Sequence, residues 1–202
     1  MGPRRPVPAV LRILPWVLTV GGLIGLAASG ILIIEKINLL SRPGYVPSCS
    51  ISPIVSCGSV MTSWQAEVFG LPNPLLGAAG FAVAATIGVM LLAGAAPPRW
   101  FWLGLHTGTA LGVGLIHWLI FQSLYRINAL CPYCMVVWAV TIPIFWYVTV
   151  HNLHTGILST SDRWRRTGDV LASYHGIVLT VWFMIITLAI THRFWDYWST
   201  LL

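Results

Sequence analysis

Two cysteines three residues apart, in Cys131-Pro132-Tyr133-Cys134, are the side chains of this sequence best suited to chemistry. If Cys131 is the N-cap of a helix and Pro132 its first residue, Cys134 lies about one turn further along the same face. Free backbone N–H groups and the positive end of the helix dipole favour a thiolate there. Because the thiolate is the form that attacks disulfides, this spacing predicts a redox-active pair.

Three other uses of this pair agree less well with the sequence. Covalent haem attachment requires a histidine directly after the second cysteine, where this chain has Met135. A structural zinc site needs four ligands, usually in two close pairs, whereas Cys49 and Cys57 are eight residues apart. Unreactive buried thiols are an alternative, since free cysteine is a common apolar filler, but the proline at the helix start disfavours it. We therefore expect no metal.

The composition is that of a membrane protein. Of 202 residues, 57% are hydrophobic and 8% are charged, and the mean hydropathy is +0.82. Soluble domains carry about 25% charged residues, which cover their water-exposed surface. The net charge of +6 does not indicate nucleic acid as a partner, because the arginines lie between apolar segments and form no basic cluster with aromatic residues.

Five apolar segments are long enough to cross a lipid bilayer as helices. They cover residues 13–37, 74–96, 100–125, 131–150 and 171–190. The first is longer than the roughly 7–15 apolar residues of a signal peptide, so we expect it to be retained. The expected parts are an N-terminal arm at 1–12, a membrane domain at 13–195 with an external cysteine loop at 38–73, and a tail at 196–202.

Two patterns predict how the helices are placed. In the loop, Val60, Met61, Trp64 and Val68 recur at helical spacing, which predicts one short amphipathic helix at the membrane interface over residues 58–68. Small residues recur at every fourth position in three spans: Gly21, Gly25 and Ser29; Gly80, Ala84 and Gly88; Gly104, Gly108 and Gly112. Such spacing lets helices approach closely in lipid, so we expect these residues at helix contacts of an all-α bundle.

Positive charge at the ends of the spans predicts the orientation in the membrane. One side carries Arg4, Arg5, Arg12, Arg99, Arg163, Arg165 and Arg166, and the other carries Lys36, Arg42, Arg126 and Arg193. Because cytoplasmic loops are enriched in lysine and arginine, the N-terminus is expected inside the cell. All four cysteines and the C-terminus then lie outside, where disulfides persist.

The other ionisable residues give weaker signals. His106 and His117 share a face of the third span, but a haem between helices also needs histidines at matching depth on a second helix. His117 lies well inside the span, where it could carry protons or form a neutral hydrogen bond between helices. Glu35, Lys36 and Glu67 lie near the outer boundary and are expected to be solvated.

Four thiols at one membrane face can pass an oxidation from pair to pair by thiol–disulfide exchange. The loop pair can meet a protein in the aqueous phase. The pair at the helix start lies at the bilayer boundary, where it can meet a lipid-soluble acceptor of two electrons. The natural acceptor of this kind in a membrane is a quinone.

The sequence resembles the vitamin K epoxide reductase family and its bacterial homologues. The resemblance rests on Cys49-x7-Cys57, Ser63, Phe69-Gly70, Asn73-Pro74-x-x-Gly77 and Cys131-x-x-Cys134, and it extends over the five spans in order and spacing. Quinone-linked thiol oxidases of the DsbB type have the reverse order, with Cys-x-x-Cys in the first external loop. The resemblance implies a four-helix core around a quinone, plus one extra helix.

The resemblance also implies roles for single residues. Cys134 exchanges electrons with the quinone, Cys131 links to the loop through Cys57, and Cys49 is the outermost thiol, the first to meet a partner protein. Asn73 matches the asparagine that hydrogen-bonds a quinone carbonyl in the family. Asn followed by Pro is also a plain N-cap and first helical residue, so both roles stay open for Asn73.

The other expected quinone contacts are less specific. Trp138 stands where mammalian members carry a tyrosine that binds the second carbonyl, and its indole N–H can donate one hydrogen bond. It could equally pack over the quinone ring or fill the bundle. Met61, Ser63 and Trp64 are expected to help wall the quinone pocket.

By this resemblance, the chain generates disulfides in an exported thioredoxin-fold (DsbA-like) partner and passes the electrons to menaquinone or ubiquinone in a bacterial plasma membrane. Some relatives carry a thioredoxin-like domain after the fifth span; because this chain ends at Leu202, we expect a separate partner. Two alternatives stay open: reduction of a quinone or its epoxide as the physiological purpose, and a non-catalytic scaffold or transporter with two structural disulfides.

Overall fold

The structure is a computed structural model that describes residues 9–68, 70–158 and 161–199. The first eight residues of the expected arm, Phe69 and the last three residues of the tail lie outside the described residues. Within the described residues the secondary structure is helical, apart from one isolated β-bridge between Val55 and Leu130.

Five helices are long and apolar enough to cross a membrane, which confirms the predicted five-span architecture. They are α1 (Ala9–Ser41), α3 (Asn73–Leu92), α4 (Arg99–Gln122), α5 (Pro132–His154) and α7 (His175–Arg193). α4 continues into η2, a π-helical turn (Ser123–Ile127), and the chain then turns at Asn128, whose φ is 56°. Asparagine tolerates this left-handed conformation better than most residues.

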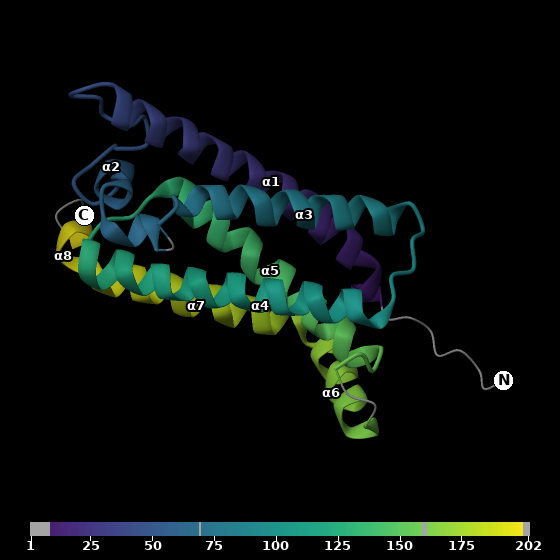
Figure 1. The fold of residues 1–202 in the computed structure, drawn as a ribbon. Coiled ribbons are helices and arrows are strands. Elements are labelled where there is room, and N and C mark those ends of the chain that lie inside the picture. The colour runs from purple at the N-terminus through teal and green to yellow at the C-terminus, as the bar shows by residue number, and fades with distance from the viewer. Residues whose placement is uncertain (1–8, 69, 159–160, 200–202) are drawn as a thin grey trace.

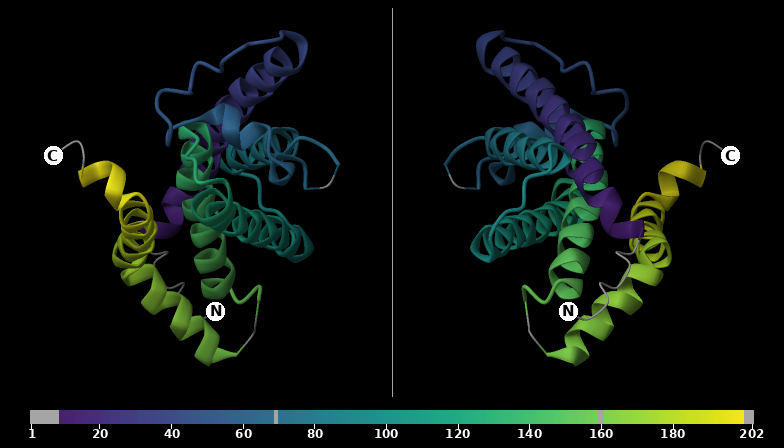
Figure 2. Two further views of the ribbon diagram at one scale, coloured as in Figure 1. Left: turned by 90° about the vertical axis from the view of Figure 1, so that its left-hand side faces the viewer. Right: turned by 90° about the vertical axis from the view of Figure 1, so that its right-hand side faces the viewer.

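α5 lies at the centre of the bundle (Figure 2). α1 packs against α3 on one side and α5 on another, and α4 packs against α5. The views from the two ends place α7 on the opposite side of α5 from α3 (Figure 2), and α7 meets α4 where Nε1 of Trp182 donates to Nε2 of His117. α7 contacts the others through side chains such as Trp182 and Phe183, which pack on the apolar cluster around Ile142 of α5.

The two ends of the bundle carry different elements (Figure 1). At one end lie the cysteine loop, here residues 42–72 between α1 and α3, the start of α5, and the C-terminal α8 (Trp195–Ser199). The start of α1, the α3–α4 connection and α6 (Asp162–Ser173) lie at the opposite end. All four cysteines therefore share one end of the bundle.

The cysteine loop contains two short helices where the sequence predicts one. α2 (Cys57–Met61) ends where Thr62 donates both its backbone N–H and its hydroxyl to the carbonyl of Gly58, at 3.0 and 2.9 Å. The chain then restarts as a 3₁₀-helix, η1 (Trp64–Glu67). The break ends the regular spacing, so Met61 is buried whereas Trp64 is exposed.

α6 lies mainly in the interval between the fourth and fifth predicted spans, and its last residues overlap the start of the span predicted at 171–190, which begins as α7 at His175. Nδ1 of His154, at the end of α5, lies 2.5 Å from Oδ1 of Asp169 on α6. Gly168 lets the two backbones meet, because a Cβ there would lie 2.7 Å from the backbone N of His154. These contacts with α5 position α6 at this end of the bundle.

The glycines predicted at helix contacts fall into two groups. Gly25 and Gly88 lie in the α1–α3 contact: a Cβ on Gly25 would be 2.5 Å from the ring of Phe81, and one on Gly88 would be 2.5 Å from the backbone N of Thr19. Around Gly80, Gly104 and Gly108, by contrast, a Cβ would have nothing within 4 Å. The prediction that all these residues pack helices together is wrong for the second group.

Gly88→Ala is expected to lower the free energy of unfolding by about 1–3 kcal/mol, the usual cost of overpacking, because its methyl group would press on the α1 backbone. Gly80→Ala on the same helix is the matched control, since its methyl group would enter open space. Thermal unfolding in detergent, followed by tryptophan fluorescence, compares the two. Equal Tm values for both variants would contradict the close contact of α1 and α3 at Gly88.

Candidate active site

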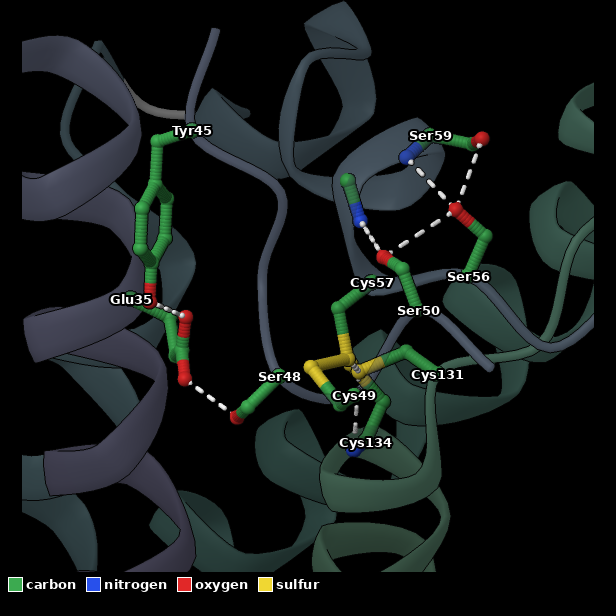
Figure 3. Close-up of a disulfide and its surroundings, with 11 residues drawn as sticks. Glu35, Tyr45, Ser48, Cys49, Ser50, Ser56, Cys57, Ser59, Cys131 and Cys134 are labelled. Atoms are coloured by element: carbon green, nitrogen blue, oxygen red, sulfur yellow. Dashed lines mark hydrogen bonds between the residues drawn. A yellow bond between two sulfur atoms is a disulfide. The ribbon is translucent and has the colours of Figure 1, made fainter. Parts of the chain in front are cut away.

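The four cysteines meet at the loop end of the bundle (Figure 3). Cys49 and Cys57 form a disulfide within the cysteine loop, whereas Cys131 and Cys134 are free thiols. The Sγ atoms of Cys57 and Cys131 are 3.4 Å apart. The disulfide and the thiol of Cys131 are all buried in one apolar cluster, so an exchange between them needs no large movement.

The start of α5 has the predicted geometry. Cys131 is the N-cap, Pro132 is the first helical residue, and the backbone N–H of Cys134 donates to Sγ of Cys131 at 3.3 Å. Hydrogen bonds from the side chain and the backbone of Cys134 lower the pKa of the Cys131 thiol, although burial opposes them. A lower pKa enlarges the thiolate fraction, which favours exchange of Cys131 with a disulfide.

Backbone pairing fixes Cys57 opposite Cys131. At the isolated parallel bridge, the N–H of Leu130 donates to the carbonyl of Ile54 at 2.7 Å, and the N–H of Ser56 donates to the carbonyl of Leu130 at 3.0 Å. Cys57 and Cys131 each directly follow one of these bonded residues. The bridge therefore sets the distance between the two sulfur atoms.

The turn before Cys131 is also held from α7. Nε of Arg193 donates to the carbonyl of Leu124 at 2.9 Å, and its Nη2 donates to Oδ1 of Asn128. Both acceptors lie between the end of α4 and Cys131. A fixed turn keeps the N-cap thiol in place while its disulfide partner changes.

Glu35, near the end of α1, is buried, so the prediction that it is solvated is wrong. Its carboxylate accepts hydrogen bonds from the hydroxyl of Tyr45 at 2.8 Å and from that of Ser48 at 2.5 Å (Figure 3). The chain folds back over α1 and satisfies the charge there, which is necessary because an unpaired buried carboxylate is costly.

The next residue, Lys36, is also buried, and the same prediction is wrong for it. Its Nζ donates to the carbonyl of Met61 at 2.7 Å and lies 3.0 Å from Oε1 of Glu67. The side chain of Glu67 remains partly exposed, at 45%. Glu35 and Lys36 thus bind the two halves of the cysteine loop, before Cys49 and after Cys57.

An apolar cavity of about 900 Å³ lies between α3 and α4 and reaches the start of α5. Cys134 lines it, while Cys131 faces Cys57. Gly104 and Gly108 of α4 also line it, so these small residues leave space where the sequence predicted a helix contact. Leu111 lines the wall and is 71% exposed, so the cavity is open on this side of the bundle.

Most of the residues predicted to contact a quinone line this cavity. They are Asn73, Trp138, Met61 and Ser63. Trp64 does not: it is 69% exposed, and its ring packs edge-on against Trp118 with the ring centroids 5.9 Å apart. The break between α2 and η1 turns Trp64 away from the cavity, so it is not retained as a pocket residue.

Asn73 does not cap α3, because the N-cap is Pro72. Its Nδ2 donates to the carbonyl of Gln65 at 2.7 Å, and its Oδ1 accepts from the N–H of Val68 at 3.3 Å. These bonds join η1 to α3. An amide nitrogen carries two hydrogens, so the second N–H of Asn73 remains for a ligand in the cavity.

This combination of spans, cysteine pairs and cavity agrees with the comparison with known families. A model described as the vitamin K epoxide reductase family matches residues 16–149, more than half of the chain and all four cysteines. The chain belongs to the vitamin K epoxide reductase family. It is a multi-pass membrane protein of a family of quinone-linked thiol oxidoreductases. A search of curated protein sequences gave no match.

The family uses a quinone, and the cavity fits one. Its volume is within the roughly 300–1,000 Å³ of small-molecule sites, and its walls are mainly apolar, as the ring and tail of a membrane quinone require. Trp138 lies one helical turn beyond Cys134 on the same wall. Its indole N–H has no protein partner among the described residues, so it is available to a quinone carbonyl, as is the second N–H of Asn73.

Gln65 is a further cavity residue of this vitamin K epoxide reductase family member, one that the sequence pattern did not single out. Gln65 is buried, lines the cavity, and donates from Nε2 to Oε1 of Gln122 on α4 at 3.4 Å. Its backbone carbonyl accepts from Asn73. A polar side chain beside the apolar residues of the predicted loop helix was the signal that could have indicated it.

His117 forms the neutral bond between helices that was one of its two predicted roles. Its Nδ1 donates to the carbonyl of Val113 at 2.7 Å, and its Nε2 accepts from Nε1–H of Trp182 on α7 at 2.9 Å. One donor and one acceptor nitrogen define the neutral ring. Among the described residues, no group of three or more His, Cys, Asp or Glu side chains is placed to hold a metal ion.

Proposed function

We propose that this protein oxidises the dithiol of an exported thioredoxin-fold protein and passes the electrons through Cys49/Cys57 and Cys131/Cys134 to a membrane quinone. The supporting observation is that the two thiols of α5 face different reactants. Cys131 lies 3.4 Å from the sulfur of Cys57, while Cys134 lines the apolar cavity. One helix turn thus connects the loop disulfide with the quinone site.

The partner is oxidised at the loop disulfide. A partner thiolate attacks Sγ of Cys49, the Cys49–Cys57 bond breaks, and Cys57 leaves as a thiolate. The second partner thiol then attacks the mixed disulfide, so the partner leaves with its own disulfide and Cys49 becomes a thiol. Two electrons have passed to the loop pair.

The loop pair is reoxidised by the helix pair. Cys57 attacks Sγ of Cys131 in a Cys131–Cys134 disulfide, and Cys134 leaves as a thiolate. Cys49 then attacks Cys57, which restores the loop disulfide and frees Cys131. The resulting state, with a loop disulfide and two free thiols on α5, is the state of the structure.

The quinone, when bound, accepts two electrons and two protons from the helix pair. Cys134 lies against its cavity, and Cys131 then closes the disulfide within α5. Asn73 and Trp138 offer hydrogen-bond donors to the quinone carbonyls. The apolar wall excludes water, which limits loss of the electrons to side reactions.

The direction and the location are part of the proposal. External compartments are kept oxidising by coupling to quinone, and the charge count places the cysteine end of the bundle outside a bacterial plasma membrane. Menaquinone and ubiquinone both suit a mainly apolar cavity. In the reverse direction the same residues would reduce a quinone or its epoxide.

Labelling of the thiols with and without quinone tests this proposal. The purified protein is reduced with dithiothreitol, freed of reductant, mixed with an excess of a short-chain menaquinone or ubiquinone, whose fully substituted rings do not add thiols, and trapped with N-ethylmaleimide for mass spectrometry. With excess quinone we expect Cys131 and Cys134 to lose their label first and Cys49 and Cys57 to lose theirs by exchange with the helix pair, with one quinol formed per disulfide. If the cysteines are labelled to the same extent with and without quinone, the result would instead support a scaffold or transporter with structural cysteines.

A further inference from the structure

The loop disulfide is inaccessible in the structure, although the proposed function requires a protein to attack it. Cys49 is 5% exposed and Cys57 is fully buried. Cys49 is therefore not an outermost thiol in this conformation. The flanking residues Val46 and Ile51 are 69% and 77% exposed, so a partner can contact this segment before its thiolate can reach Cys49.

The part of the loop after Cys57 is held firmly. The backbone bridge to Leu130 lies just before Cys57. After Cys57, the side chain of Lys36 binds the carbonyl of Met61 and the carboxylate of Glu67. Gln65 and Asn73 add hydrogen bonds from η1 to α4 and α3. Movement of this part would also displace Cys57 from Cys131.

The part before Cys49 is attached to α1 differently. Two of its side-chain hydrogen bonds to α1 end on the carboxylate of Glu35, from Tyr45 and from Ser48, the residue next to Cys49 (Figure 3). The phenol of Tyr45 also interacts with the side chain of Asn38 on α1. Hydroxyl groups can exchange such bonds for water when the segment moves. The hydrogen bond to Glu35 also raises the pKa of Tyr45, as expected for a phenol that donates to a carboxylate.

We propose that Glu35 is a positioning residue that holds Cys49 in its buried place through Ser48 and Tyr45, and that the partner must break these two hydrogen bonds to reach the disulfide. The inference rests on the proposed function for its purpose, but the hold on Cys49 can be measured without it. The segment before Cys49 opens, while Cys57 stays opposite Cys131. Opening at Cys49 alone lets the partner attack one sulfur and leaves the other aligned for the next exchange.

The experiment measures how fast the Cys49–Cys57 disulfide is reduced in the purified full chain, with neither quinone nor partner present. Tris(2-carboxyethyl)phosphine is added, and samples are trapped with N-ethylmaleimide for mass spectrometry. Glu35→Gln and Ser48→Ala are expected to speed the reduction about tenfold, because each weakens or removes a hydrogen bond to a charged group. Ser48→Thr keeps the hydroxyl and should restore the wild-type rate.

Two controls separate a hold on Cys49 from a general loss of structure. Ser41→Ala removes a hydroxyl at the end of α1 that donates to the carbonyl of Ile37 within its own helix, and should leave the rate unchanged. In Glu35→Gln, the alkylation of Cys131 should stay at the wild-type rate. Unchanged disulfide reduction in Glu35→Gln and Ser48→Ala, or equal acceleration at Cys131, would overturn the inference. Failure of quinone to oxidise the helix thiols would overturn the proposed function alone.

Discussion

Cys134→Ala is expected to abolish quinone reduction with every thiol donor, whereas Cys49→Ala is expected to abolish only oxidation of the protein partner. Cys134 is the cysteine that lines the cavity, so no other thiol of the chain can replace it there. Cys49 is needed to receive a protein thiolate, but dithiothreitol is small enough to attack a Cys131–Cys134 disulfide at Cys134, which is half-buried whereas Cys131 is buried. Quinol formation with each donor measures both effects.

Cys134→Ala has a second expected result, since Cys131 then lacks its neighbour. Its sulfur lies 3.4 Å from that of Cys57, so a Cys57–Cys131 mixed disulfide should accumulate. Proteolysis between positions 57 and 131 followed by a non-reducing gel would show two fragments held together. If Cys49→Ala also eliminates the dithiothreitol activity, the loop pair is an obligatory part of the quinone chemistry and the order of the two pairs is wrong.

The start of α5 could be predicted from the sequence because its geometry is local. An N-cap followed by proline fixes the helix start, and three residues of spacing then fix the direction of Cys134. The spans could be predicted for a similar reason, since the hydrocarbon core sets their length. Neither result depends on which distant segment folds against these residues.

The remainder of the site depends on distant contacts. The bridge between Val55 and Leu130 is a single residue pair, so no strand pattern precedes it in the sequence. Glu35 and Lys36 lie near a span end, where solvation is the ordinary expectation for charges. Only the fold of the loop over α1 supplies Ser48 and Met61 as their partners, and it buries both charges.

The glycines at four-residue spacing are a second case in which the sequence does not show what a residue contacts. Spacing by four residues is identical for Gly88, which meets the α1 backbone, and for Gly108, which faces the cavity. A small residue can permit close helix packing or leave room for a ligand, and the sequence does not separate these uses. Their different surroundings lead to different expected effects of substitution.

Gly108→Leu is expected to stop turnover with quinone while the protein stays folded. A side chain added there meets nothing within 4 Å at its Cβ and would extend into the cavity that Cys134 lines. The thiol steps occur on the other side of Cys134, at Cys131 and Cys57, so they should continue. We expect the variant to accept one pair of electrons per disulfide from dithiothreitol and then stall, with the KM for quinone raised at least about tenfold wherever residual turnover remains.

Gly114→Leu is the matched control on the same helix. A Cβ at Gly114 also meets nothing within 4 Å, but Gly114 does not line the cavity. Both variants place the same side chain in open space on α4, so a general effect on the helix would lower quinone reduction equally in both. A loss confined to Gly108→Leu would locate the quinone between α3 and α4. Wild-type turnover in Gly108→Leu would instead exclude this part of the cavity as the place where the quinone meets Cys134.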